Sequence, residues 1–549
     1  MRIKVLYDNP SENILTRLLK VRNINDNIEN FLNPSFKTYR KDPFLLDWME
    51  IAIERIIKAI NSNERIMILW DYDVDGITST AVVYEFFKRF LGYKNISVRL
   101  PHRLRDWYGI KDYHLEEIKQ KGVSLVITVD NWITAVNEAL YAKKLWLDLI
   151  ITDHHTPLEI LPEALAVINP KTSSKYPFKE LAGVGVAFKL ITALASKFFK
   201  DKALKKKIIN YFLPIVAIWT VADCVPLIDE NRLFVKKWLE ILNKRNNIHP
   251  NIEYLLNFLN LKKVDTFHIW YVIWPRLNAS GRLQDPYNSF FSLVSSNKVK
   301  QKKYLEILET LNKQRQNIQE NYIRKASSLI DKRKKILVVY DPEFHEWVVW
   351  IIAWRLTEKY NRPSIVLTYN KEKDLIVGSL RWPDYFNIVE MLKEAWPYLV
   401  NFGWHKQAWW LSLKKENLDK VISIFENYCN ANISDVDLEK EILVDTYIYP
   451  FEINSNDLNL ITKLAPFGEW NPEPLFLIDD VKIIKKEVVW QKHLKIWGDI
   501  KGSIVEFLYW NNACKIDEID IWDRKKIICK VKEDRLSSNW YYFEIIFVI

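Results

Sequence analysis

Between residues 46 and 260, two arrangements of hydrophobic residues alternate along the chain. Segments with apolar residues at helical spacing, at 46–61 and 77–91, alternate with short continuous apolar segments. The apolar segments read ERIMIL, SLVITVD, DLIITDHH and ALAVIN. This alternation predicts a parallel sheet covered by helices. Ligands of such sheets bind at the carboxyl ends of the strands.

The second half of the chain has three further patterns. A highly charged stretch at 299–335, with Leu and Ile at helical spacing, predicts a long connecting helix. Strand KILVVY, a helix at 348–360 and strands PSIVLTY and LIVGSL predict a second α/β unit. From about residue 440, short alternating strands separated by turn residues predict a small β-barrel.

The predicted fold class is therefore α/β, with a parallel-sheet domain and a second α/β domain joined by a long helix, and with an OB-like β-barrel at the carboxyl end. A length of 549 residues agrees with several domains. The expected parts are a helical lead-in (1–45), the parallel-sheet domain (46–298), the connecting helix (299–335), the second α/β domain (336–430) and an OB-like nucleic-acid-binding domain (431–549).

Charge and cysteine content narrow the functional classes. The net charge of +10 favours a polyanionic partner, although Lys and Arg are also ordinary surface residues. The four cysteines are far apart and form no CxxC pair, which argues against a disulfide framework and a zinc site. The longest apolar stretch, 211–222, is too short to cross a bilayer, and the first residues lack the apolar core of a signal peptide. We expect a soluble, cytoplasmic protein with no membrane partner.

Glycine is scarce in this chain and tryptophan is abundant. Glycine usually supplies about 7% of residues, or about 38 here, but the chain has 12 glycines and 23 tryptophans. Several tryptophans occupy turn-like contexts, where a residue without Cβ is usually needed: Trp70, Trp132, Trp274 and Trp404. We hypothesise that many of them are glycines in the living protein, because UGA codons read there as Gly were translated as Trp. The alternative is a genuinely tryptophan-rich protein.

Acidic residues and histidines follow several of the apolar segments. They occur as DYDVDG (71–76), Asp130 after SLVITV, Asp153-His154-His155 after DLIIT, and Asp223 in TVADCVPL. Each aspartate alone is more simply a helix cap or turn former. If all four segments are strands of one sheet, however, their ends meet at one edge. Carboxylates with an imidazole then suit Mn²⁺ or Mg²⁺ better than structural zinc.

The motifs DYDVDG, VDN, DHH and VAD, in this order, resemble those of the DHH phosphoesterase superfamily. GVGVAFKL (183–190) and PRLNASGR (275–282) resemble its RecJ branch, and the similarity extends through GSLR, FGWHKQAWW and PFGEWNPEP over nearly the whole chain. By this resemblance two metal ions would be held by Asp73, Asp75, Asp130, His154 and Asp223, with Asp75 or Asp130 bridging. His155 would face the scissile phosphate, and Asp71 and Asp153 would orient the metal ligands.

The resemblance also implies residues that recognise phosphate. These are Arg276, Ser280 and Arg282 of PRLNASGR, Ser379 and Arg381 of GSLR, His405 of FGWHKQAWW, and Arg103. Arginine suits phosphate oxygens because its guanidinium donates two parallel hydrogen bonds. A surface ion pair is the simpler reading of each arginine, and for Arg103 the two readings are about even. His405 could equally be a buried hinge residue.

The function implied is a 5′-to-3′ exonuclease specific for single-stranded DNA, which releases mononucleotides in DNA repair and recombination. The alternatives are a phosphodiesterase for oligonucleotides or cyclic dinucleotides, and an inactive replication scaffold. Expected partners are single-stranded DNA and, from the family, a single-strand-binding protein or a RecQ-type helicase. The chain departs from the family mainly by Trp at family Gly positions, at residues 70, 107, 132, 219, 274, 347, 350, 404, 410, 470 and 490.

Overall fold

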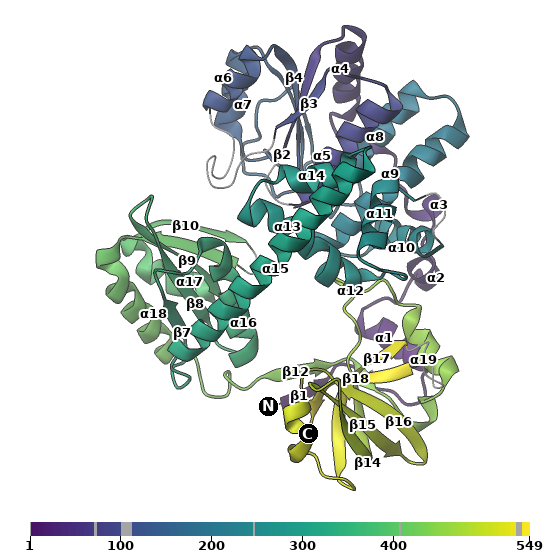
Figure 1. The fold of residues 1–549 in the computed structure, drawn as a ribbon, viewed down its shortest axis with the longest axis vertical. Coiled ribbons are helices and arrows are strands. Elements are labelled where there is room, and N and C mark those ends of the chain that lie inside the picture. The colour runs from purple at the N-terminus through teal and green to yellow at the C-terminus, as the bar shows by residue number, and fades with distance from the viewer. Residues whose placement is uncertain (1, 71–73, 100–111, 245–247, 406–407, 534–540) are drawn as a thin grey trace. The chain divides into compact units, whose positions relative to one another are not determined.

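The computed structural model describes residues 2–70, 74–99, 112–244, 248–405, 408–533 and 541–549, and for residues 403–405 and 408 it describes the backbone alone. The described chain forms two compact units (Figure 1). One contains residues 5–312 and 444–549, and the other contains residues 1–4 and 313–443.

The centre of the larger unit is a parallel five-stranded sheet of order β3-β2-β4-β5-β6. Its strands are β2 (Arg65–Trp70), β3 (Ile96–Arg99), β4 (Val123–Val129), β5 (Asp148–Thr152) and β6 (Ala166–Ile168). Side chains of β2 alternate between two hydrophobic clusters, because successive residues of a strand point to opposite faces. Ile66 and Ile68 pack on one face, and Met67 and Leu69 on the other.

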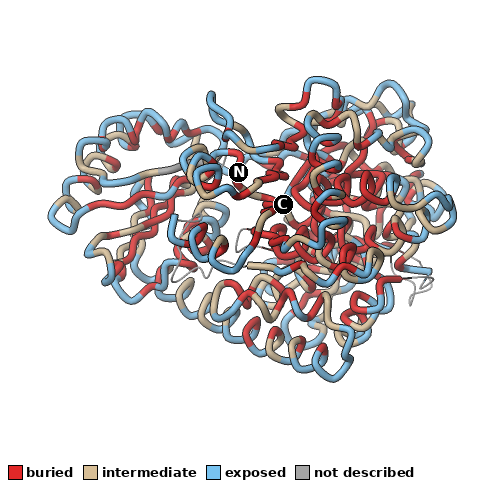
Figure 2. The backbone as a smooth tube through the Cα atoms, turned by 90° about the horizontal axis from the view of Figure 1, so that it is seen from above, coloured by how far each residue is buried: buried red, intermediate tan, exposed pale blue. Residues whose placement is uncertain are grey.

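Helices cover both faces of this sheet, so the layers are helix, sheet and helix (Figure 1). The first face is covered by α4 (Met49–Asn61), α5 (Val74–Glu85) and α8 (Gly183–Phe198), and the second by α6 (Asp112–Gln120) and α7 (Val136–Lys144). Both faces are buried, which explains why the strands read as continuous apolar runs. In Figure 2 the buried positions occupy the inner segments of the tube and the exposed positions its outer turns.

Further helices extend the first face into a mostly helical region. They are α9 (Lys202–Ala222), α10 (Asp229–Lys244), α11 (Pro250–Phe258), α12 (Thr266–His268), α13 (Trp274–Leu283) and α14 (Tyr287–Val294). Two π-helical turns, η2 (Phe86–Phe90) and η3 (Ile269–Ile273), continue α5 and precede α13. The N-terminal residues add α1 (Ile14–Val21), α2 (Ile28–Leu32) and α3 (Phe36–Tyr39). The predicted connecting helix is α15 (Lys298–Leu329), which is 32 residues long.

The smaller unit is built on a five-stranded sheet of order β10-β11-β9-β8-β7. Its strands are β7 (Leu337–Tyr340), β8 (Ser364–Asn370), β9 (Leu375–Arg381), β10 (Leu399–His405) and β11 (Ala408–Leu413). Only β7 and β8 pair in parallel; the other neighbours are antiparallel. The helices are α16 (Glu346–Tyr360), α17 (Ile388–Ala395) and α18 (Leu418–Asn432).

The C-terminal region is a closed barrel. Its strands are β14 (Phe476–Val489), β15 (His493–Ile500), β16 (Ser503–Tyr509), β17 (Arg524–Glu533) and β18 (Tyr541–Val548). They pair in the order β14-β15-β16-β18-β17, and β17 pairs back with β14. The short strand β13 (Thr446–Tyr447) pairs with β14, α19 (Ser455–Thr462) packs on α1, and β12 (Glu441–Val444) pairs with β1 (Arg2–Val5). The α/β fold with a parallel sheet, a long helix and a C-terminal barrel is thus confirmed.

Some local expectations were wrong. Trp274 and PRLNASGR lie in helix α13 and not in a turn, and FGWHKQAWW supplies parts of the strands β10 and β11. Strands β1, β3, β10, β11 and β17 were not expected, and β1 lies in the part predicted as a helical lead-in. Among the described residues, no helix combines the length and the apolar character needed to cross a membrane.

Candidate metal centre

Asp130 lies on a tight turn directly after strand β4. Its backbone has a φ of 60° and its N–H donates to the carbonyl of Thr152 in β5 at 2.9 Å. Its side chain is 2% exposed. The turn therefore holds a buried carboxylate at the carboxyl edge of the parallel sheet, as the sequence predicts.

Asp153 organises the end of the neighbouring strand β5. Its Oδ1 accepts hydrogen bonds from the backbone N–H groups of His154, at 2.7 Å, and His155, at 3.1 Å. The same oxygen lies 2.8 Å from Nδ1 of His155, and Oδ2 accepts from the N–H of Ile133 at 2.8 Å. Asp153 thus joins the turns after β4 and β5, and it directs the half-exposed ring of His155.

His154 lies between two acidic side chains. Its Nε2 is 3.2 Å from Oδ1 of Asp130 and 3.5 Å from Oδ2 of Asp223. This buried nitrogen has no hydrogen-bond partner among the described residues. Two groups of potential ligands share His154, one with Asp130 and His155 and the other with Asp75 and Asp223, and within each group the ligand atoms lie within 4.8 Å of one another.

Asp75 occupies the first turn of α5 and reaches the amino end of α8. Its two carboxylate oxygens accept from the backbone N–H groups of Gly183, at 2.9 Å, and Val184, at 3.1 Å. The first N–H groups of a helix lack intrahelical partners and carry partial positive charge, so a carboxylate is favoured there. Asp75 therefore fixes α8 against the sheet edge while it lies near His154 and Asp223.

The electrostatics of the site favour a neutral His154. Burial, together with the charge of the neighbouring His155, lowers its pKa to about 3. A neutral imidazole has a free nitrogen lone pair, which is the form that binds metals. The pKa of Asp153 is also lowered: burial opposes ionisation, but the hydrogen bond and charge of His155 outweigh it. Carboxylates beside a neutral imidazole are a donor set that fits Mn²⁺ or Mg²⁺.

The local position of Asp223 differs from the expectation. It was expected at the end of a strand, but it is the C-cap of helix α9. The apolar run before it, 211–222, is the buried half of that helix, and a short apolar run alone does not distinguish a helix from a strand. The predicted meeting of Asp223 with the strand-end residues nevertheless occurs, because α9 ends at the edge of the sheet.

Four of the predicted site residues lie wholly or partly outside the described residues. Asp71, Asp73 and Arg103 lie outside the described residues, and so does the side chain of His405. Trp132, two residues after Asp130, is 2% exposed and packs with the hydrophobic residues on the sheet face that α6 and α7 cover.

The PRLNASGR residues lie on α13, which packs on α5. Nε of Arg276 donates to Oε2 of Glu309 at 2.6 Å, so this arginine has the ion pair of the simpler reading. Ser280 is fully buried, and its Oγ donates to the carbonyl of Asp285 at 2.5 Å. Arg282 is half-buried.

The GSLR residues belong to the smaller unit. Ser379 and Arg381 are two residues apart on β9 and therefore point to the same face. Ser379 is buried and pairs across the sheet with Trp410. Burial lowers the pKa of Arg381 to about 10, and its guanidinium lies 5.9 Å from the ring centre of Trp350.

Sequence reasoning missed two residues that support the centre. Gly183 begins α8 so close to Asp130 that a Cβ there would lie 2.7 Å from Cγ of Asp130. Asn169, after β6, is fully buried and donates to the carbonyl of His155 at 3.0 Å. The motif GVGVAFKL and the polar residue that ends ALAVIN were the available signals.

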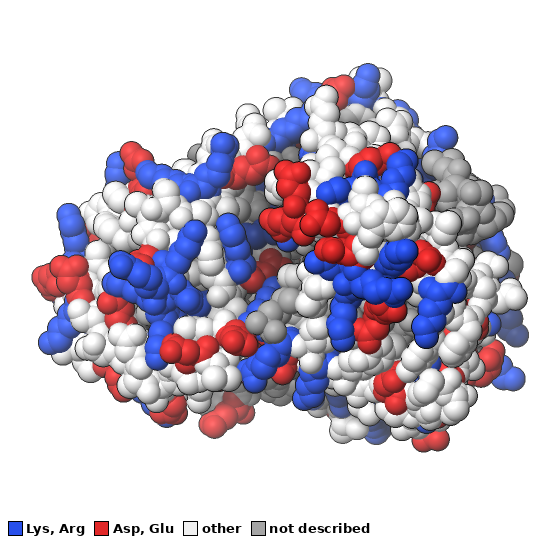
Figure 3. Space-filling view, turned by 90° about the horizontal axis from the view of Figure 1, so that it is seen from below, with Lys and Arg blue, Asp and Glu red and all other residues white. Residues whose placement is uncertain are grey.

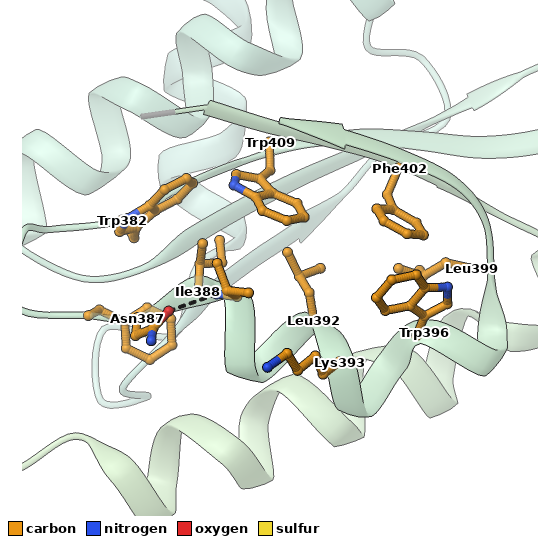
Figure 4. A pocket seen from close by; sticks show the side chains of 11 residues that line it. Trp382, Asn387, Ile388, Leu392, Lys393, Trp396, Leu399, Phe402 and Trp409 are labelled. Atoms are coloured by element: carbon orange, nitrogen blue, oxygen red, sulfur yellow. Dashed lines mark hydrogen bonds between the residues drawn. The ribbon is translucent and has the colours of Figure 1, made fainter. Parts of the chain in front are cut away.

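Two further surface features lie outside the metal centre. On the face drawn in Figure 3, basic side chains gather in several groups that acidic side chains interrupt. The smaller unit has a pocket of about 450 Å³ between α17 and the sheet (Figure 4), with an aromatic wall that includes Trp382, Trp396 and Trp409.

Comparison with known proteins first defines the class. Residues 65–218, which include the strands and turns of the centre, match the model of the DHH family, N-terminal domain. Residues 444–540 match the RecJ OB domain. The two matches together define the chain as a DHH-family protein with an OB domain of the RecJ type.

The relatives specify the family. The single-stranded-DNA-specific exonuclease RecJ of Bacillus subtilis is 32% identical over 92% of this chain, and that of Salmonella typhimurium is 31% identical over 84%. The chain spans 65% of the first relative and 83% of the second. The crystal structure of RecJ from Thermus thermophilus in complex with Mn²⁺ has the same fold, with a TM-score of 0.81 and 23% identity over all of this chain and 79% of that one. The chain belongs to the RecJ family.

Proposed function

We propose that this chain is a metal-dependent exonuclease that degrades single-stranded DNA from its 5′ end and releases mononucleotides. The observation that supports this most directly is the pair of ligand groups that share His154, with all ligand atoms of a group within 4.8 Å. The RecJ relatives are single-stranded-DNA-specific exonucleases, and RecJ from T. thermophilus has been crystallised with both Mn²⁺ and Mg²⁺.

The metal ligands in this proposal are Asp73, Asp75, Asp130, His154 and Asp223. When bound, two divalent cations would activate a water molecule and stabilise the attacking and leaving oxygens of the phosphodiester. The chain's own contribution is to hold the carboxylates and the neutral imidazole within reach of both ions. Asp75 does this from the first turn of α5, where the amino end of α8 holds its carboxylate, and Asp130 from the turn after β4.

His155 is proposed to contact the scissile phosphate. Because the carboxylate of Asp153 is an acceptor, it keeps a proton on Nδ1 of His155. Nε2, on the opposite side of the ring, is then the nitrogen that can face the substrate. The half-exposed ring suits contact with a substrate. Asp71 is proposed to orient the ligands in the same manner as Asp153.

Recognition of the terminal phosphate is assigned to Arg276, Ser280, Arg282, Ser379 and Arg381, with His405 and Arg103 as further candidates. For Arg276 this requires exchange of its partner Glu309 for a phosphate oxygen. The barrel would hold the strand by charge and base stacking, as in other OB folds. A single-strand-binding protein or a RecQ-type helicase as partner, and action in the cytoplasm, are further parts of the proposal.

The test is a nuclease assay on a 5′-labelled single strand, the same strand in a duplex, and a dinucleotide, each with Mn²⁺, with Mg²⁺ or with EDTA. We expect mononucleotides from the single strand alone, and none with EDTA. Asp130→Asn should abolish the products. Asp148→Asn is the matched control on the same sheet, because Asp148 is half-exposed, pairs with Arg55 and belongs to neither ligand group.

The outcomes separate the alternative functions. Turnover of the dinucleotide in preference to the long strand would replace the proposal with an oligonucleotide phosphodiesterase. Binding of single-stranded DNA without turnover in any metal would replace it with an inactive scaffold. Asp130→Asn with full activity would refute the assigned centre.

A further inference from the structure

Six tryptophans have a backbone conformation that L side chains rarely adopt. Their φ angles lie between 46° and 90°, and they are Trp48, Trp132, Trp146, Trp470, Trp490 and Trp522. For a bulky residue a positive φ is a true outlier, whereas glycine adopts it freely. Five of the six are also exposed, Trp146 to 86%. All six positions therefore have the conformation of turn glycines, and five of them also have the exposure of a surface turn.

Other aromatic residues do not share this property. The remaining positive-φ residues other than glycine are mainly Asn and Asp, which tolerate the left-handed region. Among the described residues no Phe or Tyr has a positive φ, although the chain contains 26 of each. The conformation is thus associated with tryptophan positions and not with large aromatic side chains in general.

Buried tryptophans provide a second, independent observation. The indole N–H groups of Trp70, Trp219, Trp238 and Trp347 are buried and have no hydrogen-bond partner in the part of the chain that the structure describes. Buried tryptophans usually bond this group, because an unmade hydrogen bond in the interior is costly. Trp497 shows the usual behaviour: its N–H donates to Oε1 of Glu506 at 3.2 Å, and Lys485 and Lys495 lie over its ring.

Position 132 links this pattern to the metal centre. It has the largest φ of the six, 90°, and stands two residues after Asp130, whose φ is 60°. The N–H of the next residue, Ile133, donates to Asp153 at 2.8 Å, and the carbonyl of position 132 accepts from Ala135 at 3.1 Å. The backbone at 132 therefore belongs to the same turn as Asp130 and directly precedes the N–H that bonds Asp153.

We propose that the ten positions with positive φ or an unbonded buried indole are glycine in the cellular protein, and that the glycine at 132 is a positioning residue for the metal-binding carboxylates. Trp497 is assigned as a true tryptophan. The codons at the ten positions are then UGA, read as glycine, and the codon at 497 is UGG.

The decisive experiment is mass spectrometry of tryptic peptides from the protein purified from its source cells. The peptide of residues 122–143 contains position 132 as its only tryptophan position, and that of residues 496–501 contains position 497. We expect the first to have the mass of glycine at 132 and the second the mass of tryptophan at 497. A tryptophan mass at 132, or UGG codons at the ten positions, would overturn the proposal.

The positioning role is tested with recombinant full-length chains. In a background with glycine at the other nine positions, position 132 is Trp, Ala or Gly, and Mn²⁺ binding is measured by electron paramagnetic resonance together with activity. We expect Gly to bind Mn²⁺ at least about tenfold more tightly than Trp or Ala, since residues that orient metal ligands usually change affinity by this amount. Alanine equal to glycine would refute a backbone role.

Position 146 is the matched control, because it has φ 55° and lies on the surface, before β5. Changing it from Trp to Gly in the same background should raise Tm and leave the Mn²⁺ affinity unchanged. An equal change of Mn²⁺ affinity at 146 and 132 would show general stabilisation instead of positioning. If no version degrades DNA, the proposed function fails, while the peptide masses still decide the glycine assignment.

Discussion

Gly183→Ala tests how closely helix α8 packs against the metal centre. A Cβ built at Gly183 lies 2.7 Å from Cγ and 2.8 Å from Cβ of Asp130, well inside contact distance. Gly185, two residues later in the same helix, offers a matched control. A Cβ there lies 3.4 Å from Cδ2 and 3.5 Å from Cβ of Leu181, which is close to ordinary van der Waals contact.

The two substitutions differ in their expected size. Carbon atoms pack at about 3.5 Å or more, so Asp130 must retreat by roughly 1 Å to admit a methyl group at position 183. A displacement of about 1 Å at a reacting centre can reduce the rate by about 100-fold. Crowding of this kind also destabilises by about 1–3 kcal/mol. Alanine at 185 gains up to about 1 kcal/mol over glycine in a helix.

The assay measures kcat/KM on a single-stranded oligonucleotide, Mn²⁺ affinity and Tm for both variants, with the residue at 132 that the peptide masses establish. We expect Gly183→Ala to lose about 100-fold in kcat/KM and to bind Mn²⁺ more weakly. Gly185→Ala should keep its activity and its Tm or gain slightly in Tm. The reasoning fails if Gly183→Ala keeps full activity and Mn²⁺ affinity, or if the two variants behave alike.

Three further predictions concern the barrel and the metal. Arg232→Met should destabilise the larger unit by about 3 kcal/mol. The buried guanidinium donates hydrogen bonds to the carbonyls of residues 31 and 464–466, and these carbonyls would lose their partner. An unchanged Tm would contradict this prediction. Mn²⁺ at about 100 times its Kd should add about 2.7 kcal/mol of stability, measured as a Tm shift that EDTA and Asp130→Ala remove. In the folded protein an alkylating reagent should modify the exposed Cys514 and spare Cys529, whose burial raises its thiol pKa; equal labelling would argue against closure of the barrel at β17.

Much of the fold could be predicted because the parallel sheet is buried on both faces. The segments ERIMIL and DLIITDHH contain the long apolar runs that this environment requires, and they coincide with β2 and β5. Strand β17 could not be found in the same way, since it reads RKKIICKVKE and only its central residues are buried. Its place is determined by pairing with β14, from which it is separated in the chain by β15 and β16.

The residues of the candidate metal centre could be named from the sequence, but the elements that carry them and their contacts could be predicted only in part. Asp130 and Asp153 follow directly from strand ends, so local sequence was sufficient to place them. Asp223 was expected at a strand end because a short apolar run fits both a strand and a buried helix. Gly183 was noticed only as part of the motif GVGVAFKL and given no role of its own, because its importance depends on a contact with Asp130, far earlier in the chain.

The contacts of Asp75 explain why the centre needs a helix as well as a sheet edge. Several carboxylates close to one another repel, and the sheet edge alone offers little positive charge to oppose this. The amino end of α8 supplies two backbone N–H groups to Asp75 and the partial charge of the helix. Those bonds require close approach of the helix, which the missing Cβ of Gly183 permits. The acidic cluster is therefore held together before any cation binds, and a change at Gly183 should weaken metal binding although Gly183 offers no ligand atom.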